Sequence, residues 1–176
     1  MVIMFIVLAC VVLLIGGTGF LLAPRMSGRE RVHPFFGIKW AHRGLHNMKK
    51  GIPENSMKAF QAAVDAGDGI ELDVHLTKDN QIVVFHDDTF ERVCGKKGTV
   101  EETTYTEMKK YFLSGTKERI PLLKDVLKTV DGKVPLLIEV KLPSANTKVC
   151  QRLDEELQGY KGKYMIQSFN SLVLRW

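Results

Sequence analysis

Short, largely apolar segments alternate with helix-like segments along residues 37–176, and this alternation constrains the fold more than any other feature of the sequence. The apolar segments predict strands at 37–42, 69–76, 81–86, 135–141 and 164–169. Apolar residues at helical spacing predict helices at 54–66, 104–113, 121–130 and 147–160. Strands that alternate with helices are typical of α/β domains, so we expect a mainly parallel sheet covered by helices.

One connection departs from this pattern, because the segments "ELDV" and "VVFH" are too close for a crossover helix. The intervening "KDNQ" (78–81) is a turn signal and predicts an antiparallel hairpin. If the first and last residues of this turn pair, Asp73 lies opposite His86 and shares a face with it. Glu71 is two residues from Asp73 and lies on the same face. We therefore expect Glu71, Asp73 and His86 to converge.

The N-terminal run at residues 2–22 carries no charged side chain. About 20 such residues span a bilayer, and no basic segment or small-residue cleavage site typical of a signal peptide is evident. We predict a transmembrane anchor at 1–23 and a juxtamembrane linker at 24–36, rich in Pro, Gly, Ser and Arg. Basic residues follow the run and none precedes it, which predicts a single-pass membrane protein with the domain at 37–176 on the cytoplasmic side.

The charge balance excludes some partner classes. The net charge is +5, from 25 basic and 20 acidic residues, and no basic run is interleaved with aromatic residues. This pattern argues against nucleic acid as a partner and is compatible with an anionic substrate or an acidic membrane surface. The three cysteines show no metal-binding spacing, so we interpret them as reduced structural thiols.

Paired charged residues interrupt two of the predicted strands. Glu71 and Asp73 lie on one strand face, where two carboxylates repel each other unless a partner neutralises them. A solvated acidic face on an edge strand is one explanation, and a hard divalent cation with oxygen ligands is the other. Glu139 and Lys141 repeat the same spacing after a second apolar run. This repetition favours a shared site for a metal ion and an anion.

Two histidines also end predicted strands. His42 and His86 follow apolar segments, and although a lone histidine there is usually structural, two of them suit general acid and base catalysis. Arg43 offers a planar fork for a phosphate group, and Lys141 offers a point charge for the same oxygens. A metal ion, two histidines and two cations together suit phosphodiester cleavage. One histidine would activate the attacking hydroxyl and the other would protonate the leaving alkoxide.

The ordered segments "HRG", "PENS", "GIELDVHLT", "VVFHDDT", "RIPLLKDVL" and "LLIEVK" resemble the glycerophosphodiester phosphodiesterase family over residues 37–176. The resemblance implies a (β/α)8 TIM barrel with its site at the C-terminal ends of the strands. It also implies Mg²⁺- or Ca²⁺-dependent hydrolysis of a glycerophosphodiester to glycerol 3-phosphate and an alcohol. Attack by the substrate's own glycerol hydroxyl and attack by water both fit the residue types. The implied roles are metal binding by Glu71, Asp73 and Glu139, acid/base catalysis by His42 and His86, phosphate binding by Arg43 and Lys141, and support by Glu54 and Asn55.

Three residues near these motifs have alternative interpretations, and a fourth is a further candidate for the site. Glu54 either orients Arg43 or the metal ligands, or is a helix-start acid, and Asn55 either supports the site or caps the helix. His75 shares the face of the acidic pair and is either a partner of the metal ligands or structural. Ser168 follows the last predicted strand, where barrel loops meet substrate, and is a candidate substrate contact.

The chain is short for the implied fold, since a complete barrel has eight strands and typically about 250 residues. We expect a barrel truncated after about five strands, preceded by one transmembrane helix. Three functions fit this sequence: a membrane-anchored glycerophosphodiesterase, a lysophospholipase D-type enzyme that acts on lysophospholipids, and an inactive membrane-bound binding module.

Overall fold

The computed structural model describes residues 2–22, 30, 33–144 and 147–176. The chain divides into two compact units, Met1–Gly37 and Ile38–Trp176. Each unit is considered by itself below, and the functional residues predicted from the sequence all belong to the second.

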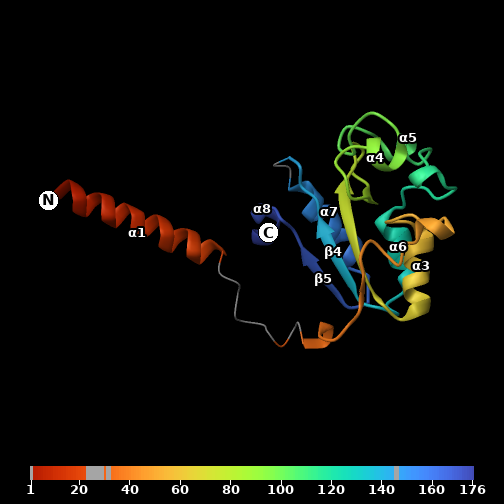
Figure 1. The fold of residues 1–176 in the computed structure, drawn as a ribbon, viewed down its shortest axis with the longest axis horizontal. Helices are drawn as coiled ribbons and strands as arrows, with labels where there is room; N and C mark the ends of the chain where they lie inside the picture. Colours follow the sequence, from red (N-terminus) through yellow and green to blue (C-terminus); the bar gives the residue numbers. More distant parts are fainter. Residues whose placement is uncertain (1, 23–29, 31–32, 145–146) are drawn as a thin grey trace. The chain divides into compact units, whose positions relative to one another are not determined.

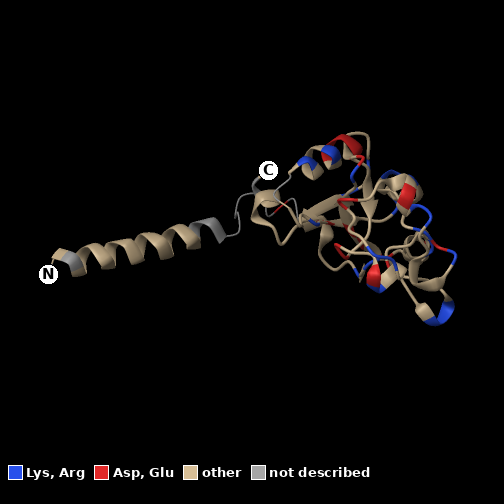
Figure 2. Cartoon of the chain, turned by 90° about the horizontal axis from the view of Figure 1, so that it is seen from above, with Lys and Arg blue, Asp and Glu red and all other residues tan. Residues whose placement is uncertain are grey.

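The first unit contains helix α1 (Val2–Leu22) and the short 3-10 turn η1 (His33–Phe35). Helix α1 carries no acidic or basic residue (Figure 2). A membrane span needs about 20 contiguous apolar residues, and no helix in the described part of the chain is both long enough and apolar enough. The predicted transmembrane helix at 1–23 is therefore not confirmed, and the membrane localisation stays a prediction. Most of the predicted linker at 24–36 lies outside the described residues.

The second unit is built on a five-stranded sheet flanked by helices (Figure 1). The strands are β1 (Trp40–Ala41), β2 (Gly69–Leu76), β3 (Ile82–Val84), β4 (Leu136–Val140) and β5 (Tyr164–Gln167). The helices and 3-10 turns are η2 (Met48–Lys50), α3 (Met57–Ala66), α4 (Glu91–Cys94), α5 (Tyr105–Met108), η3 (Leu113–Gly115), α6 (Leu123–Val130), α7 (Lys148–Leu157) and α8 (Ser171–Arg175). Strands β1, β2, β4 and β5 are parallel in that order, and β3 pairs antiparallel with β2. The predicted α/β class with a mainly parallel sheet is confirmed.

The two faces of β2 have different chemistry because side chains alternate along a strand. Ile70, Leu72 and Val74 belong to a core cluster shared with side chains of α3, α6 and α7. Burial of one such side chain contributes about 1.5–3 kcal/mol, so this face holds the helices on the sheet. The alternate residues Glu71 and Asp73 therefore lie on the opposite face, away from the helical layer.

A second apolar cluster lies in the long segment between β3 and α6. Phe85, Phe90 and Met108 are among its fully buried members. This segment also contacts the hairpin tip, since the Lys78 amide donates to the Thr103 carbonyl over 3.1 Å. The segment is therefore packed around a core of its own, which positions the residues that follow β3.

The register of the β2–β3 hairpin differs by one residue from the prediction. Val74 pairs with Val84, and the Phe85 amide donates to the Asp73 carbonyl over 3.0 Å. Asp73 therefore lies opposite Phe85, and the predicted pairing of Asp73 with His86 is wrong.

The cause is the length of the turn. The Thr77 amide donates to the Gln81 carbonyl over 2.9 Å, so three residues, not two, connect the strands. Asn80, the last of the three, has a left-handed backbone with φ +59°. A three-residue loop that ends in a left-handed residue is a common hairpin connection, and asparagine tolerates that conformation.

Candidate active site

Three buried carboxylates meet on the face of the sheet opposite the helices. Glu71 and Asp73 come from β2, and Glu139 comes from β4, where it pairs in register with Asp73. One carboxylate oxygen from each residue lies within 4.8 Å of the others. The side chains are nearly inaccessible to solvent, so their mutual repulsion is poorly screened. The structure thus brings together the three predicted metal ligands.

The electrostatics of this cluster suit a divalent cation. Burial raises the pKa of Glu71 to about 7, and the neighbouring charges of Asp73 and Glu139 add to the rise. The hydrogen bond from the Arg43 amide lowers the pKa and offsets part of this rise. Asp73 Oδ1 is buried and accepts no hydrogen bond from any described residue, although Lys141 Nζ lies 3.1 Å away. Clustered carboxylate oxygens are the ligands that Mg²⁺ and Ca²⁺ prefer, and Asp73 Oδ1 has capacity left to bind such an ion. The residues therefore fit the implied metal ion.

Lys141 lies against the same carboxylates. Its Nζ donates a short hydrogen bond to Glu139 and forms an ion pair with Asp73 over 3.1 Å. Burial alone would lower the pKa of Lys141, but the hydrogen bond to Glu139 and the charge of Asp73 raise it above its usual value. Gln167 on β5, which the sequence did not indicate, donates to Glu139 Oε2 over 3.1 Å. Lys141 is therefore a fixed positive charge beside the predicted metal site.

Arg43 joins the site from the end of β1. Its backbone amide donates to Glu71 Oε2 over 2.8 Å, and its Nη1 donates to Glu54 Oε1 over 2.9 Å. Its Nε is buried and lies 3.6 Å from Asp73 Oδ2. This atom has no hydrogen-bond partner among the described residues. Arg43 thus keeps donor capacity at the predicted phosphate position.

The loop that carries Arg43 depends on Gly44. This glycine has φ +77°, and an added Cβ would lie 2.8 Å from Ala59 Cβ on α3. The Gly44 amide donates to the carbonyls of Ala41 and Glu71. A residue without a side chain is therefore required for the backbone to pass between β2 and α3.

Asn55 and Glu54 support the site, and neither has its alternative role. Asn55 Nδ2 donates to Asp73 Oδ2 over 2.9 Å, and the residue that caps α3 is Ser56, whose side chain accepts from Ala59. Glu54 lies outside the first turn of α3 and pairs with Arg43. The interpretations of Asn55 as a helix cap and of Glu54 as a helix-start acid are therefore wrong.

The two predicted acid/base histidines have different surroundings. The His42 side chain is 69% exposed, with Nε2 3.9 Å from Glu71 Oε2. Its pKa is lowered by partial burial and by the charge of Arg43, and the charge of His86 also contributes. His86 Nδ1 lies 2.7 Å from Asp87 Oδ1. His42 therefore lies near the carboxylate cluster, and His86 is close enough to His42 for their charges to interact.

His75 is a fully buried neighbour of this arrangement. Its Nε2 contacts the His86 carbonyl oxygen over 3.2 Å, and burial lowers the pKa of its imidazole. His75 thus supports the backbone of His86, which agrees with the structural role left open by the sequence.

Asp87 and Arg92 belong to this arrangement but were not predicted from the sequence. Asp87 contacts His86, and the hydrogen bond from Arg92 is the main reason why the pKa of Asp87 falls to about 2. Asp87 could have been found, because it directly follows a predicted catalytic histidine. Arg92 gave no signal, since it lies five residues beyond Asp87 in the short helix α4.

A hollow of about 490 Å³ opens beside the site at the C-terminal ends of β4 and β5. Its lining includes Glu139, Lys141, Asp88 and Ser168. The Ser168 hydroxyl donates to the Val140 carbonyl over 2.7 Å and accepts from the Asn170 amide. The hollow is of the size that small-molecule sites have, and Ser168 helps to shape its wall.

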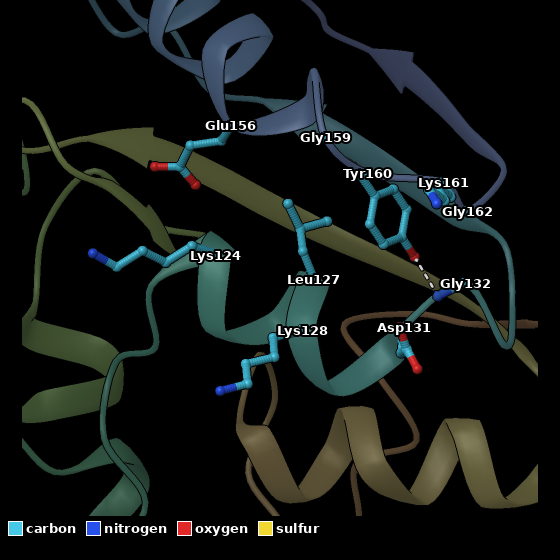
Figure 3. A pocket seen from close by; sticks show the side chains of 10 residues that line it. All are labelled: Lys124, Leu127, Lys128, Asp131, Gly132, Glu156, Gly159, Tyr160, Lys161 and Gly162. Atoms are coloured by element: carbon cyan, nitrogen blue, oxygen red, sulfur yellow. Dashed lines mark hydrogen bonds between the residues drawn. The ribbon is translucent and has the colours of Figure 1, made fainter.

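A second pocket, of about 480 Å³, lies between α6, the end of α7 and the turns that lead into β4 and β5 (Figure 3). Lys124 and Lys128 line it together with Asp131 and Glu156. The hydroxyl of Tyr160 accepts a hydrogen bond from the Gly132 amide over 3.3 Å. Because its charges are mixed and it is remote from the strand ends that carry the carboxylates, we assign it no part in the site.

Comparisons with known proteins agree with this geometry. Residues 42–175 match the sequence model of the glycerophosphoryl diester phosphodiesterase family. The chain is 38% identical over 148 residues to a glycerophosphodiester phosphodiesterase from Caldanaerobacter subterraneus, which covers 77% of this chain and 59% of that protein. It is 33% identical over 174 residues to a lysophospholipase D from Rattus norvegicus, which covers 89% of this chain and 54% of that protein. The chain thus spans little more than half the length of these relatives.

Solved structures show the same fold. An Oleispira antarctica phosphodiesterase in complex with the product sn-glycerol-3-phosphate matches with a TM-score of 0.74 at 25% identity, over 82% of this chain and 62% of that chain. A glycerophosphodiester phosphodiesterase from Thermotoga maritima matches with a TM-score of 0.65 at 31% identity, over 78% and 56% of the respective chains. The sheet described above therefore resembles part of the fold of these phosphodiesterases.

Proposed function

Because this chain belongs to the glycerophosphoryl diester phosphodiesterase family, we propose that the protein hydrolyses glycerophosphodiesters to glycerol 3-phosphate and an alcohol in a metal-dependent reaction. The observation that carries the proposal is the buried cluster of Glu71, Asp73 and Glu139 with Lys141 and Arg43 at its edge. Acidic oxygens for a cation and two positive groups for an anion lie on one face of the sheet. This combination suits a phosphodiester bound to a divalent ion.

Each residue has a role in this proposal. Mg²⁺ or Ca²⁺ would be held by Glu71, Asp73 and Glu139. When bound, the cation would neutralise negative charge on the phosphoryl oxygens. Arg43 and Lys141 bind the remaining phosphate oxygens.

The histidines handle protons in the proposed reaction. His42 accepts the proton of the attacking hydroxyl, because its lowered pKa keeps the imidazole neutral near pH 7. His86 donates a proton to the leaving alkoxide. The attacking hydroxyl belongs either to water, which gives glycerol 3-phosphate directly, or to the glycerol of the substrate, which gives a cyclic phosphate that water then opens.

The test is release of glycerol 3-phosphate from glycerophosphocholine with Mg²⁺, with Ca²⁺ and with EDTA. It uses this chain and a chain extended to the length of its relatives. We expect metal-dependent release that is lost in His42→Ala and Glu71→Gln. Lys128→Met, at the remote pocket, serves as a control that keeps activity. Absence of release from both chains would contradict the proposed reaction.

A second candidate is a lysophospholipase D activity. The observation that favours it is the likeness to the rat lysophospholipase D over 89% of this chain. Lysophosphatidylcholine is compared with glycerophosphocholine, and choline is measured for both, because the lysophospholipid yields lysophosphatidic acid and not glycerol 3-phosphate. Preferential release of choline from the lysophospholipid would favour this candidate, and metal binding without turnover of either substrate would favour an inactive binding module.

A further inference from the structure

The guanidinium of Arg92 contacts two carboxylates, each through two hydrogen bonds. Its Nε and Nη2 donate to the two oxygens of Asp87 over 2.6 and 2.8 Å. Its Nη1 and Nη2 donate to the two oxygens of Glu54 over 3.2 and 2.6 Å. Arginine has five N–H donors, so these contacts use most of its capacity. Arg92 is therefore poorly suited to bind a phosphate group itself.

The two carboxylates belong to different parts of the site. Glu54 lies in the loop before α3 and also accepts a hydrogen bond from Arg43 over 2.9 Å. Asp87 follows β3 and contacts His86 over 2.7 Å. Two carboxylates beside each other repel unless a cation separates them. A continuous series of charged pairs thus connects Arg43 to His86, and Arg92 is its central member.

This series determines which ring nitrogen of His86 faces Asp87 and which is left to contact substrate. An ionised carboxylate can only accept a hydrogen bond, so the Nδ1 that faces Asp87 carries a hydrogen. The Nε2 of His86 is then the atom able to exchange a proton with substrate. Because Arg92 binds both oxygens of Asp87, it holds this carboxylate in one orientation.

We propose that Arg92 is a positioning residue of the site: its guanidinium bridges Glu54 and Asp87 and thereby sets the orientation of Arg43 and of the His86 imidazole. The proposal rests on the proposed phosphodiesterase function. The Arg92 side chain is 50% exposed, and exposed ion pairs contribute little to folding stability. The bridge therefore acts mainly by orienting side chains of the site. Its loss should affect their positions more than the free energy of unfolding.

The first test is spectroscopic and needs no substrate. Histidine ¹H–¹⁵N correlation spectra of the metal-free chain, with His86 assigned by His86→Gln, should show hydrogen on Nδ1 of His86. We expect Arg92→Met to shift His86 toward a mixture of tautomers. Arg152→Met is the control, because Arg152 lies on α7 outside the site, where it pairs with Glu155 and donates to the Asn80 carbonyl of the hairpin turn over 3.1 Å. An unchanged His86 spectrum in Arg92→Met would overturn the proposal.

The second test is kinetic. We expect Arg92→Met to lower kcat by about 10- to 100-fold through misplacement of reacting groups, and to raise KM through Arg43. Arg92→Lys should recover only part of kcat, because an ammonium lacks the planar fork, while Arg152→Met should match the wild type. Wild-type kcat and KM in Arg92→Met would contradict the proposal.

The two tests separate this inference from the proposed function. If neither this chain nor the extended chain releases glycerol 3-phosphate, the proposed function fails while the His86 spectra still decide the role of Arg92. If Arg92→Met does not fold, the lysine variant decides, and a wild-type His86 spectrum in that variant would count against the bridge.

Discussion

The backbone amide of Arg43 donates a hydrogen bond to Glu71 Oε2 over 2.8 Å. The loop after β1 is therefore connected to a predicted metal ligand on β2 through the main chain, and a substitution such as Arg43→Met retains this amide donor. The side chain of Arg43 is left for other partners, namely Glu54 and the proposed phosphate. The functions of metal binding and substrate binding can thus be separated at this one residue.

Substitution Arg43→Met should weaken substrate binding and leave metal binding intact. A hydrogen bond to a charged group is worth about 1.5–3 kcal/mol, so we expect KM to rise at least about tenfold. Isothermal titration with Ca²⁺ or Mg²⁺ should give the wild-type affinity or a slightly higher one, since a nearby positive charge is removed. Lost cation binding in this variant would contradict the separation.

Removal of a carboxylate from the cluster should abolish stabilisation by the cation. A ligand at 100 times its Kd stabilises a folded protein by about 2.7 kcal/mol, which a thermal or chemical unfolding experiment detects. We expect this gain in the wild type and not in Asp73→Asn. Asp131→Asn is the matched control, because Asp131 ends α6 with φ +48°, a conformation that asparagine also tolerates. The same gain in Asp73→Asn and in the control would show that the cation binds elsewhere.

Substitution Gly44→Ala should destabilise the domain. The added methyl would lie 2.8 Å from Ala59 Cβ and 2.9 Å from its carbonyl carbon, at φ +77°. Overpacking and strain of this kind cost about 1–3 kcal/mol. Gly51→Ala separates the two causes, since Gly51 has φ +67° but no atom within 4 Å of the added Cβ. Urea denaturation should therefore show a larger loss at position 44 than at position 51, and equal losses would exclude the steric clash.

The contribution of Asp87 to stability should depend on pH. Hydrogen bonding to Arg92 lowers the pKa of Asp87 from 3.8 to about 2. A group with a lower pKa in the folded state stabilises the fold above its unfolded pKa, and this stabilisation disappears as the pH falls through its folded pKa. The difference in unfolding free energy between wild type and Asp87→Asn should be largest above pH 4 and should shrink toward pH 2. A difference that stays constant over this range would contradict the assignment.

The local pattern of the sequence determined the five strands, helices α3, α6 and α7, and most of the site, whereas the helix predicted at 104–113 is confined to α5 and α4 was not predicted. The alternation along β2 placed Glu71 and Asp73 on one face, because side chains alternate in any strand. Their meeting with Glu139 followed as well, since the ends of parallel strands lie at the same edge of a sheet.

Two features were decided only by the tertiary structure. The segment around Asn80 suits a two-residue or a three-residue turn, and only the folded structure shows the three-residue turn that places Asp73 opposite Phe85. The contact between Arg92 and Glu54 joins residues 38 positions apart. No periodicity encodes such a pair, because it depends on how two loops pack beside each other. The site residues at the strand ends can thus be predicted from local sequence. The Arg92 bridge between the loops cannot.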